Sequence, residues 1–403
     1  MSNREGLAGQ GGTARIAWLD VLRGMAVLMV LWAHLFTVGV NNPATPGDWL
    51  PTTQRYVFVR EASAGSLHNQ AAIALRDLFG INAAGVGVGL LFLVSGFVIL
   101  RAVDHSDPWN FLLRRALRTL PVCMVAVLAT GLLTYLYAAR AGVRQPSSVV
   151  DVAASSVAMA ELLGRFPTIP VLWTLTVELL FYLAIAALAL RKGRITLGKL
   201  NLLALGCFLF VLLVRSAAVA AVPLPSLYLK LNLLAEAGVY ITFMLLGSVI
   251  YRGLAAGQGG RGPLHFLAIG LLFLAGYGEY RGPLELHLRV TLADASLSLA
   301  LFLMVLRVRP SGRWTAPLRW LGGISYSLYL VHVPLGWAVL AALVGKGLTS
   351  IDAATLAVAA TLLAACLLHA AVERPAHWLA RRLTSGGHSA AAPVAMGRDL
   401  PAR

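Results

Sequence analysis

Ten long apolar stretches run through this chain, and they constrain its fold more than any other feature. They lie near residues 18–40, 84–101, 119–138, 170–190, 200–222, 234–252, 264–280, 287–306, 321–345 and 353–373. A helix needs about 20 apolar residues to cross a bilayer, because each residue adds about 1.5 Å. The chain is also 58% hydrophobic and only 12% charged, a balance foreign to soluble proteins. The sequence predicts an all-α, polytopic transmembrane helical bundle of about ten spans.

The apolar stretches place the transmembrane domain at residues 16–383. Residues 1–15 include a Gly-rich stretch, and residues 384–403 are rich in Ser, Gly, Ala and Pro, so both ends are predicted to be flexible tails. The longest interruption, residues 41–83, ends in Asn69–Phe79, which is expected to form a short surface helix. This segment is interpreted either as a lid on the outer side or as a simple connector.

The basic residues predict the orientation in the membrane. The formal net charge is +16, and 21 of the 33 Lys and Arg residues belong to the two tails and the loops after even-numbered spans, against 10 in the other loops. Basic residues concentrate on the cytoplasmic side of membrane proteins. We therefore expect a multi-pass protein of the cell (inner) membrane with both termini in the cytoplasm. The same distribution accounts for the basic charge without a nucleic-acid partner.

The three cysteines give no sign of a metal site. Cys123, Cys207 and Cys366 all lie in apolar stretches, without CxxC spacing and without a nearby pair of histidines. They are predicted to be small core residues. We expect no metal and no permanently bound cofactor.

Arg23 and His34 are eleven residues apart in the first apolar stretch. Eleven helical steps of about 100° return to within roughly 20° of the same direction, so both side chains share one face, about 16 Å apart along the axis. Ionisable side chains in a span are costly unless they face protein or water. The pair therefore predicts a functional site that contains a cation and a base. For Arg23 alone, the alternative is a side chain that extends to the lipid headgroups.

Three arginines stand at the cytoplasmic start of the third span: Arg114, Arg115 and Arg118. Arg115 and Arg118 are separated by three residues and therefore share a helix face. A guanidinium stays charged and binds phosphate oxygens through paired hydrogen bonds. The cluster predicts a phosphate-binding site, and ordinary anchoring at the membrane surface is the alternative.

Glu178 is a carboxylate about eight residues from the outer end of the fourth span. If this span runs inward and the first runs outward, Glu178 and His34 lie at a similar depth, roughly 9–12 Å below the outer surface. A carboxylate bonded to one ring nitrogen would orient the imidazole and stabilise its protonated form, as in a general base acting on a hydroxyl. The sequence therefore predicts a Glu178–His34 partnership. A structural ion pair between two helices is the alternative.

Three further features lie within the spans or at their ends. Ser95-Gly96 in the second span is interpreted as a close-packing device rather than as a nucleophile. Pro375 is expected to stop the tenth span. The ninth span carries a strip of polar side chains on one helix face, made by Ser325, Tyr329 and His332.

The order of these motifs resembles the integral-membrane acyltransferase 3 family of O-acyltransferases. The resemblance covers nearly the whole span region and rests on six motifs. These are Asp20-x-x-Arg23-Gly24 with the Arg-x10-His pair, Phe92-x-x-Ser95-Gly96-Phe97, Phe111-x3-Arg115-x2-Arg118-x2-Pro121, Trp173-x-Leu175-x-x-Glu178-x3-Tyr182, Ser325-Tyr326-Ser327-Leu328-Tyr329-Leu330-x-His332, and Glu373-Arg374-Pro375. Each motif alone is weak evidence, and the six in order are strong evidence.

The resemblance implies a function. Members of the family transfer acyl groups, often acetyl from acetyl-CoA, to hydroxyls of sugars in lipopolysaccharide, exopolysaccharide, Nod factors or macrolides. His34 matches the family's catalytic histidine, and Arg23, Arg115 and Arg118 match positions thought to serve the acyl donor. The prediction is an O-acyltransferase with catalytic His34, Glu178 and Arg23. Its donor, acyl-CoA, would be held by Arg114, Arg115 and Arg118, and its acceptor would be a carbohydrate or macrolide.

Two other functions compete with this prediction. In a proton-coupled transporter, His34, Glu178 and Arg23 would form a proton relay. Matching halves with Gly- or Pro-broken helices would favour a transporter, and the sequence lacks such halves. A membrane O-acyltransferase of the type that relies on an Asn and a His has no further motif in its favour.

Overall fold

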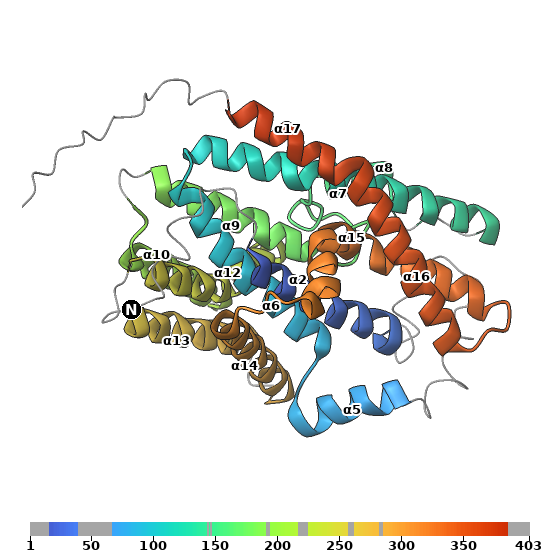
Figure 1. The fold of residues 1–403 in the computed structure, drawn as a ribbon, viewed down its shortest axis with the longest axis horizontal. Coiled ribbons are helices and arrows are strands. Elements are labelled where there is room, and N and C mark those ends of the chain that lie inside the picture. The colour runs from blue at the N-terminus through green and yellow to red at the C-terminus, as the bar shows by residue number, and fades with distance from the viewer. Residues whose placement is uncertain are drawn as a thin grey trace, which may run out of the picture.

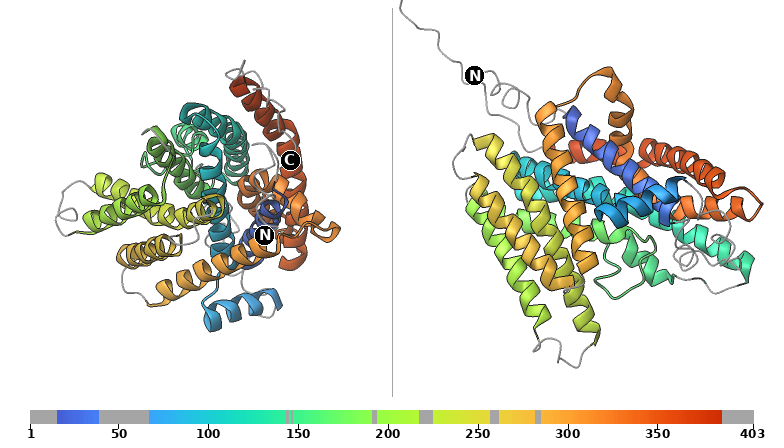
Figure 2. Two further views of the ribbon diagram at one scale, coloured as in Figure 1. Left: turned by 60° about the vertical axis from the view of Figure 1, so that its left-hand side comes forward. Right: turned by 90° about the horizontal axis from the view of Figure 1, so that it is seen from below.

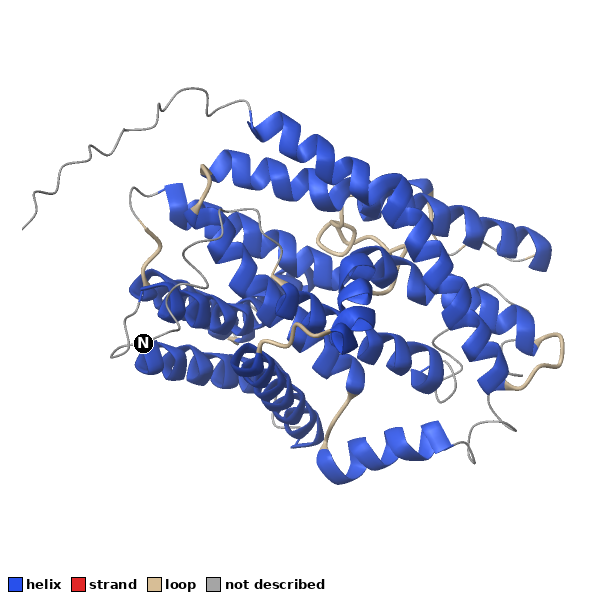
Figure 3. Cartoon of the chain, viewed as in Figure 1, coloured by secondary structure: helices blue, strands red, loops and turns tan. Residues whose placement is uncertain are grey.

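Helices and the loops between them make up the part of the chain that the computed structural model describes. This part comprises residues 16–38, 67–142, 145, 147–190, 194–216, 225–256, 262–281 and 285–385, and no strand occurs within it (Figure 3). Nine helices among these residues are long and apolar enough to cross a membrane. The predicted polytopic helical bundle is therefore confirmed.

Each of the ten predicted spans corresponds to one long helix. The helix α13, which matches the predicted span at 264–280, is the one that falls outside the nine, and it packs against α10 and α12. The ten helices are α2 (Ala17–Trp32), α6 (Ala83–Asp104), α7 (Pro108–Ala141), α9 (Leu172–Leu190), α10 (Leu197–Arg215), α12 (Pro225–Ala256), α13 (Gly262–Arg281), α14 (Glu285–Val308), α15 (Ala316–Val344) and α16 (Ser350–Leu368).

Shorter helices flank the bundle. The helix α5 (Leu67–Phe79) confirms the surface helix predicted at the end of the long interruption, and it stands apart from the main bundle in Figure 1. Residues 41–66 lie outside the described part of the chain. The two interpretations of this segment, a lid or a simple connector, concern those residues. The helix α8 (Val149–Ser156) packs against α7.

The predicted end of the tenth span is wrong. A π-helix, His369–Glu373, joins α16 to a further helix, α17 (Arg374–Ser385), which runs beside α7 (Figure 1). Pro375 stands in the first turn of α17, where a missing backbone N–H costs nothing. Helix therefore includes residues 384 and 385, which the sequence assigned to the tail. The rest of that tail and residues 1–15 lie outside the described residues.

The helices α2, α6 and α15 form the centre of the bundle. The helix α2 packs against both α6 and α15. On one side of this centre, α6 contacts α12 and α14, and α12 packs with α10 and α13. On the other side, α15 contacts α16, and α7 lies against α17 (Figures 1 and 2). The centre of the bundle is therefore where polar side chains are shielded from lipid.

Pairs of glycines bring the central helices into backbone contact. A Cβ at Gly24 of α2 would lie 2.0 Å from the backbone oxygen of Leu318, and one at Gly322 of α15 would lie 2.0 Å from that of Asp20. The crossing of α6 and α12 is built in the same way, since a Cβ at Gly96 would lie 1.8 Å from the oxygen of Met244. Only glycine permits such close crossings. The packing role predicted for Ser95-Gly96 is confirmed.

Candidate active site

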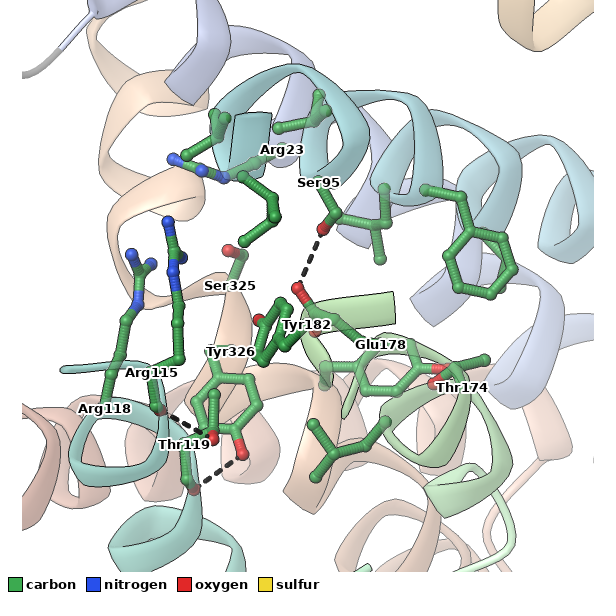
Figure 4. Close-up of a pocket in the computed structure, with 18 of the residues that line it drawn as sticks. Arg23, Ser95, Arg115, Arg118, Thr119, Thr174, Glu178, Tyr182, Ser325 and Tyr326 are labelled. Carbon is green, nitrogen blue, oxygen red and sulfur yellow. Dashed lines mark hydrogen bonds between the residues drawn. The ribbon is translucent and has the colours of Figure 1, made fainter. Parts of the chain in front are cut away.

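A cavity lies among α2, α6, α7, α9 and α15. The two glycine crossings position its walls, because Arg23 and Ser95 directly precede Gly24 and Gly96 in the chain. We call this space the arginine cavity. Its polar lining comes from all five helices (Figure 4): Arg23, Ser95, Arg115, Arg118, Thr119, Thr174, Glu178, Tyr182, Ser325, Tyr326 and Tyr329.

Arg23, Arg115 and Arg118 extend their guanidinium groups toward one side of the arginine cavity (Figure 4). Arg23 donates to the carboxylate of Asp20 at 3.2 Å. Arg115 lies over the ring of Tyr182, 5.6 Å from the ring centre. Three cations face one lining carboxylate, so the cavity carries an excess of positive charge that suits a polyanion.

The charge cluster depends on the start of α7. Asp107 caps this helix by accepting from the backbone N–H of Trp109 at 3.0 Å, and Pro108 occupies the first helical position. The helix therefore begins less than three turns before Arg115 and Arg118, which project into the cavity from neighbouring turns. The structure brings these two arginines together with Arg23, the three positions that the family resemblance linked to the acyl donor.

Arg114 lies elsewhere. Its Nε donates to the hydroxyl of Thr384 at 2.7 Å, and the side chain joins α7 to α17 instead of lining the cavity. The structure thus separates Arg114 from the two arginines with which the sequence grouped it.

Glu178 is bonded to Ser95 and not to His34. The hydroxyl of Ser95 donates to Glu178 Oε1 at 2.9 Å across the α6–α9 contact, as Figure 4 shows. His34 does not line the arginine cavity at all. The predicted Glu178–His34 pair is therefore absent from this structure. A depth estimate from the helical rise gives the height of a residue in the membrane but not the direction in which its side chain points.

His34 lines a second cavity. We call it the histidine cavity. Val88, Phe92 and Tyr329 line both cavities and separate the cations from His34. The two spaces are therefore neighbours, and a ligand that passes these three side chains would touch both.

A change of helix type sets the position of His34. The α-helix α2 ends at Trp32 and continues as a π-helix over Ala33–Val38. Trp337 of α15 donates its indole N–H to the backbone oxygen of His34 at 3.1 Å, which fixes this turn against the neighbouring helix. Single π turns inside helices are frequent at functional sites.

The ring of His34 has two partners at the same nitrogen. Its Nδ1 lies 2.9 Å from the backbone oxygen of Val30 and 3.3 Å from Nε2 of His332. His332 belongs to the polar strip that the sequence recognised on α15, and its side chain is fully buried. Ser325 and Tyr329 of the same strip line the arginine cavity, so the strip faces the site.

The rest of the histidine cavity is aromatic with a few polar groups. Trp173 and Tyr240 lie with ring centres 5.2 Å apart, and Phe92 lies 5.5 Å from Tyr240. The carboxylate of Asp294 accepts from the backbone N–H of Asn82 at 2.7 Å, at the start of α6. Aromatic faces with a carboxylate and an amide suit a ligand with both apolar faces and hydroxyl groups.

Sequence reasoning missed Asp294 and the partner of His332. Asp294 lies in the middle of the eighth apolar stretch, and the rule that singled out Glu178, an acidic residue inside a span, would have found it. His332 was placed on a helix face, but no partner was assigned to it. Its contact with His34 joins residues 298 positions apart, so no local spacing reveals it.

Glu373, from the last of the six motifs, lies outside both cavities. Its carboxylate, 2% exposed, accepts from the hydroxyl of Ser327 at 2.6 Å and contacts Nδ1 of His369 at 2.9 Å. These contacts hold the π-helix between α16 and α17 against α15.

Among the described residues, no cluster of three His, Cys, Asp or Glu side chains has the arrangement of a metal site.

The chain matches a known protein family. A family model described as an acyltransferase domain, that of the acyltransferase 3 family, matches residues 16–370, nearly the whole chain. Neither a curated protein nor a solved structure matches the chain.

Proposed function

Because the chain belongs to the acyltransferase 3 family and is a membrane-embedded O-acyltransferase, we propose that acyl-CoA is its donor and a carbohydrate or sugar-bearing molecule its acceptor. Acetyl-CoA is the expected donor, and a polysaccharide, a lipid-linked glycan or a macrolide is the expected acceptor. The observation that carries this proposal is the pair of adjoining cavities, one cationic and one containing His34.

The arginine cavity supports a CoA thioester as the donor. CoA carries several phosphate groups at one end and the thioester at the other end of a long flexible arm. Arg23, Arg115 and Arg118 would bind the phosphates through charged hydrogen bonds. The eleven residues from Arg23 to His34 correspond to about 16 Å along the helix. This separation suits a donor whose reacting group must reach His34 past Val88, Phe92 and Tyr329.

The proposed reaction uses His34 as a general base. His34 removes the proton of the acceptor hydroxyl while the hydroxyl oxygen forms a bond to the thioester carbonyl carbon. The bond from that carbon to sulfur then breaks, and the CoA thiolate leaves with the proton that His34 held. The products are an ester of the acceptor and free CoA. No stored cofactor takes part in this reaction.

The histidine cavity supports a sugar as the acceptor. The apolar faces of a sugar ring stack on aromatic side chains such as Trp173 and Tyr240, while its hydroxyls bond to polar groups such as Asn82 and Asp294. A hydroxyl of a ring bound in this way can approach His34, which lines the same cavity.

Substitution of Arg115 or Arg118 by Ala should weaken acyl-CoA binding. The loss of one charged hydrogen bond to phosphate costs about 1.5–3 kcal/mol. Lys at either position should restore binding only in part, because it keeps the charge but loses the paired hydrogen bonds. Calorimetry with a non-hydrolysable acyl-CoA analogue measures the affinity.

Arg114→Ala is the matched control, since Arg114 is on the same helix but bonds to Thr384. It should bind the analogue with wild-type affinity. Unchanged affinity in both the Arg115→Ala and the Arg118→Ala protein would show that the arginine cavity does not hold the donor.

We place the protein in the inner membrane of the cell, with both termini in the cytoplasm. It rests on the 21 basic residues assigned to one side against 10 on the other, and on an even number of spans. Alkaline phosphatase fused after α17 should then be inactive, because this enzyme folds only in the periplasm. An active fusion at this position, with an inactive fusion in the loop between α15 and α16, would contradict the orientation.

A further inference from the structure

The ring of His332 bridges a backbone oxygen and the proposed catalytic base. Its Nδ1 lies 2.7 Å from the backbone oxygen of Tyr329, and its Nε2 lies 3.3 Å from Nδ1 of His34. The ring centres of the two histidines are 5.0 Å apart with an angle of 69° between the planes. His332 is fully buried, so solvent does not compete for these bonds.

These contacts determine where the protons are. A carbonyl oxygen can only accept a hydrogen bond, so Nδ1 of His332 must carry a proton to donate to Tyr329. A neutral His332 then has a lone pair on Nε2, which accepts from Nδ1 of His34. The backbone oxygen of Val30, 2.9 Å from the same Nδ1, requires a proton there as well. The unprotonated nitrogen of His34 is therefore Nε2.

We propose that His332 is the positioning residue of His34, which holds the imidazole in the tautomer with a basic Nε2. This inference rests on the proposed function of His34 as the base. In it, His332 takes the part that the sequence assigned to Glu178, which the structure bonds to Ser95 instead.

The same contact acts during the reaction. When Nε2 of His34 takes the proton of the acceptor hydroxyl, the ring becomes positively charged, and its Nδ1–H becomes a stronger donor. The lone pair of His332 and the carbonyl of Val30 are already in place to accept this bond. Because both acceptors are fixed by helices, little reorganisation is needed as the charge develops.

Two substitutions of His332 test the proposal on the full-length protein. His332→Met removes the acceptor but keeps an elongated side chain, and it should lower kcat by about 10- to 100-fold with an unchanged KM for acyl-CoA. His332→Gln can return a carbonyl oxygen near the position of Nε2, and it should recover kcat to within about fivefold of wild type. Val333→Ala, a buried neighbour without a side-chain hydrogen bond, is the packing control, which should lower thermal stability and leave kcat unchanged.

Nitrogen-15 spectra of histidine-labelled protein provide a readout that needs no substrate. Wild-type His34 should show a protonated Nδ1 and an unprotonated Nε2. The proposal is overturned if wild-type His34 carries its proton on Nε2, if His332→Met has wild-type kcat, or if His332→Gln is no better than His332→Met. A wild-type protein without acyl transfer would contradict the proposed function instead, and the spectrum of His34 would still decide this inference.

Discussion

Substitution of His34 by Gln should lower kcat for acyl transfer by about 10²–10⁴-fold. This is the contribution that a positioned general base makes to a rate, and an amide cannot take up the proton of the acceptor hydroxyl. Gln keeps roughly the size and the hydrogen-bonding ability of imidazole, so the contacts to Val30 and His332 can be retained. The rate is measured as CoA released from acetyl-CoA by purified protein in the presence of an acceptor.

The control is His105→Gln, a histidine in an exposed turn after α6 whose Nδ1 contacts the backbone oxygen of Arg101. This variant should have the wild-type rate. The His34→Gln protein should also be monodisperse in detergent and bind acyl-CoA normally, because the cationic residues lie in the other cavity. A His34→Gln protein with more than a tenth of the wild-type kcat would reduce His34 to a structural residue.

Substitution of Arg252 by Met should destabilise the folded protein by about 3–5 kcal/mol, the usual cost of leaving a buried charge unpaired. The guanidinium of Arg252 on α12 makes two parallel bonds to the carboxylate of Asp104 on α6, at 2.7 and 2.9 Å. The two side chains are only 5% and 6% exposed. Removal of the arginine leaves Asp104 buried with only weaker partners. Thermal unfolding in detergent and chemical denaturation measure the loss.

Two further variants test this assignment. The double variant Arg252→Met with Asp104→Leu should recover most of the stability, since a buried ion pair can often be replaced by apolar residues of similar volume. Arg215→Met, at the exposed end of α10, should be close to neutral. If Arg252→Met is as stable as Arg215→Met, the ion pair does not hold α6 to α12.

The sequence predicted the helices and the common face of Arg115 and Arg118 because both depend on local patterns. Hydropathy over about 20 residues identifies a span without reference to its neighbours. The three-residue spacing of Arg115 and Arg118 fixes their common face on one helix. Arg23 was linked to these two arginines only through the family resemblance, and the structure places all three around one cavity.

The contacts between helices could not be predicted in the same way. Glu178 and His34 were paired from their similar estimated depth, but the rotation of each helix about its own axis decides which side chains meet. His34 also lies in a π-helix, which turns its side chain away from the direction that an α-helix would give. Pro375 was interpreted as a helix end, whereas it begins a new helix after a second π turn.

Release of free CoA by the purified protein tests the central claim most directly. The protein in lipid nanodiscs would be given acetyl-CoA with a soluble glycoside, with octanol as a control alcohol that has a hydroxyl but no sugar. We expect thiol release that depends on the glycoside, is far lower with octanol and disappears with His34→Gln. The account would be contradicted if the protein binds acetyl-CoA but releases no thiol above background with any glycoside from the polysaccharide, glycolipid or macrolide classes. Equal thiol release by wild type and His34→Gln would also contradict it.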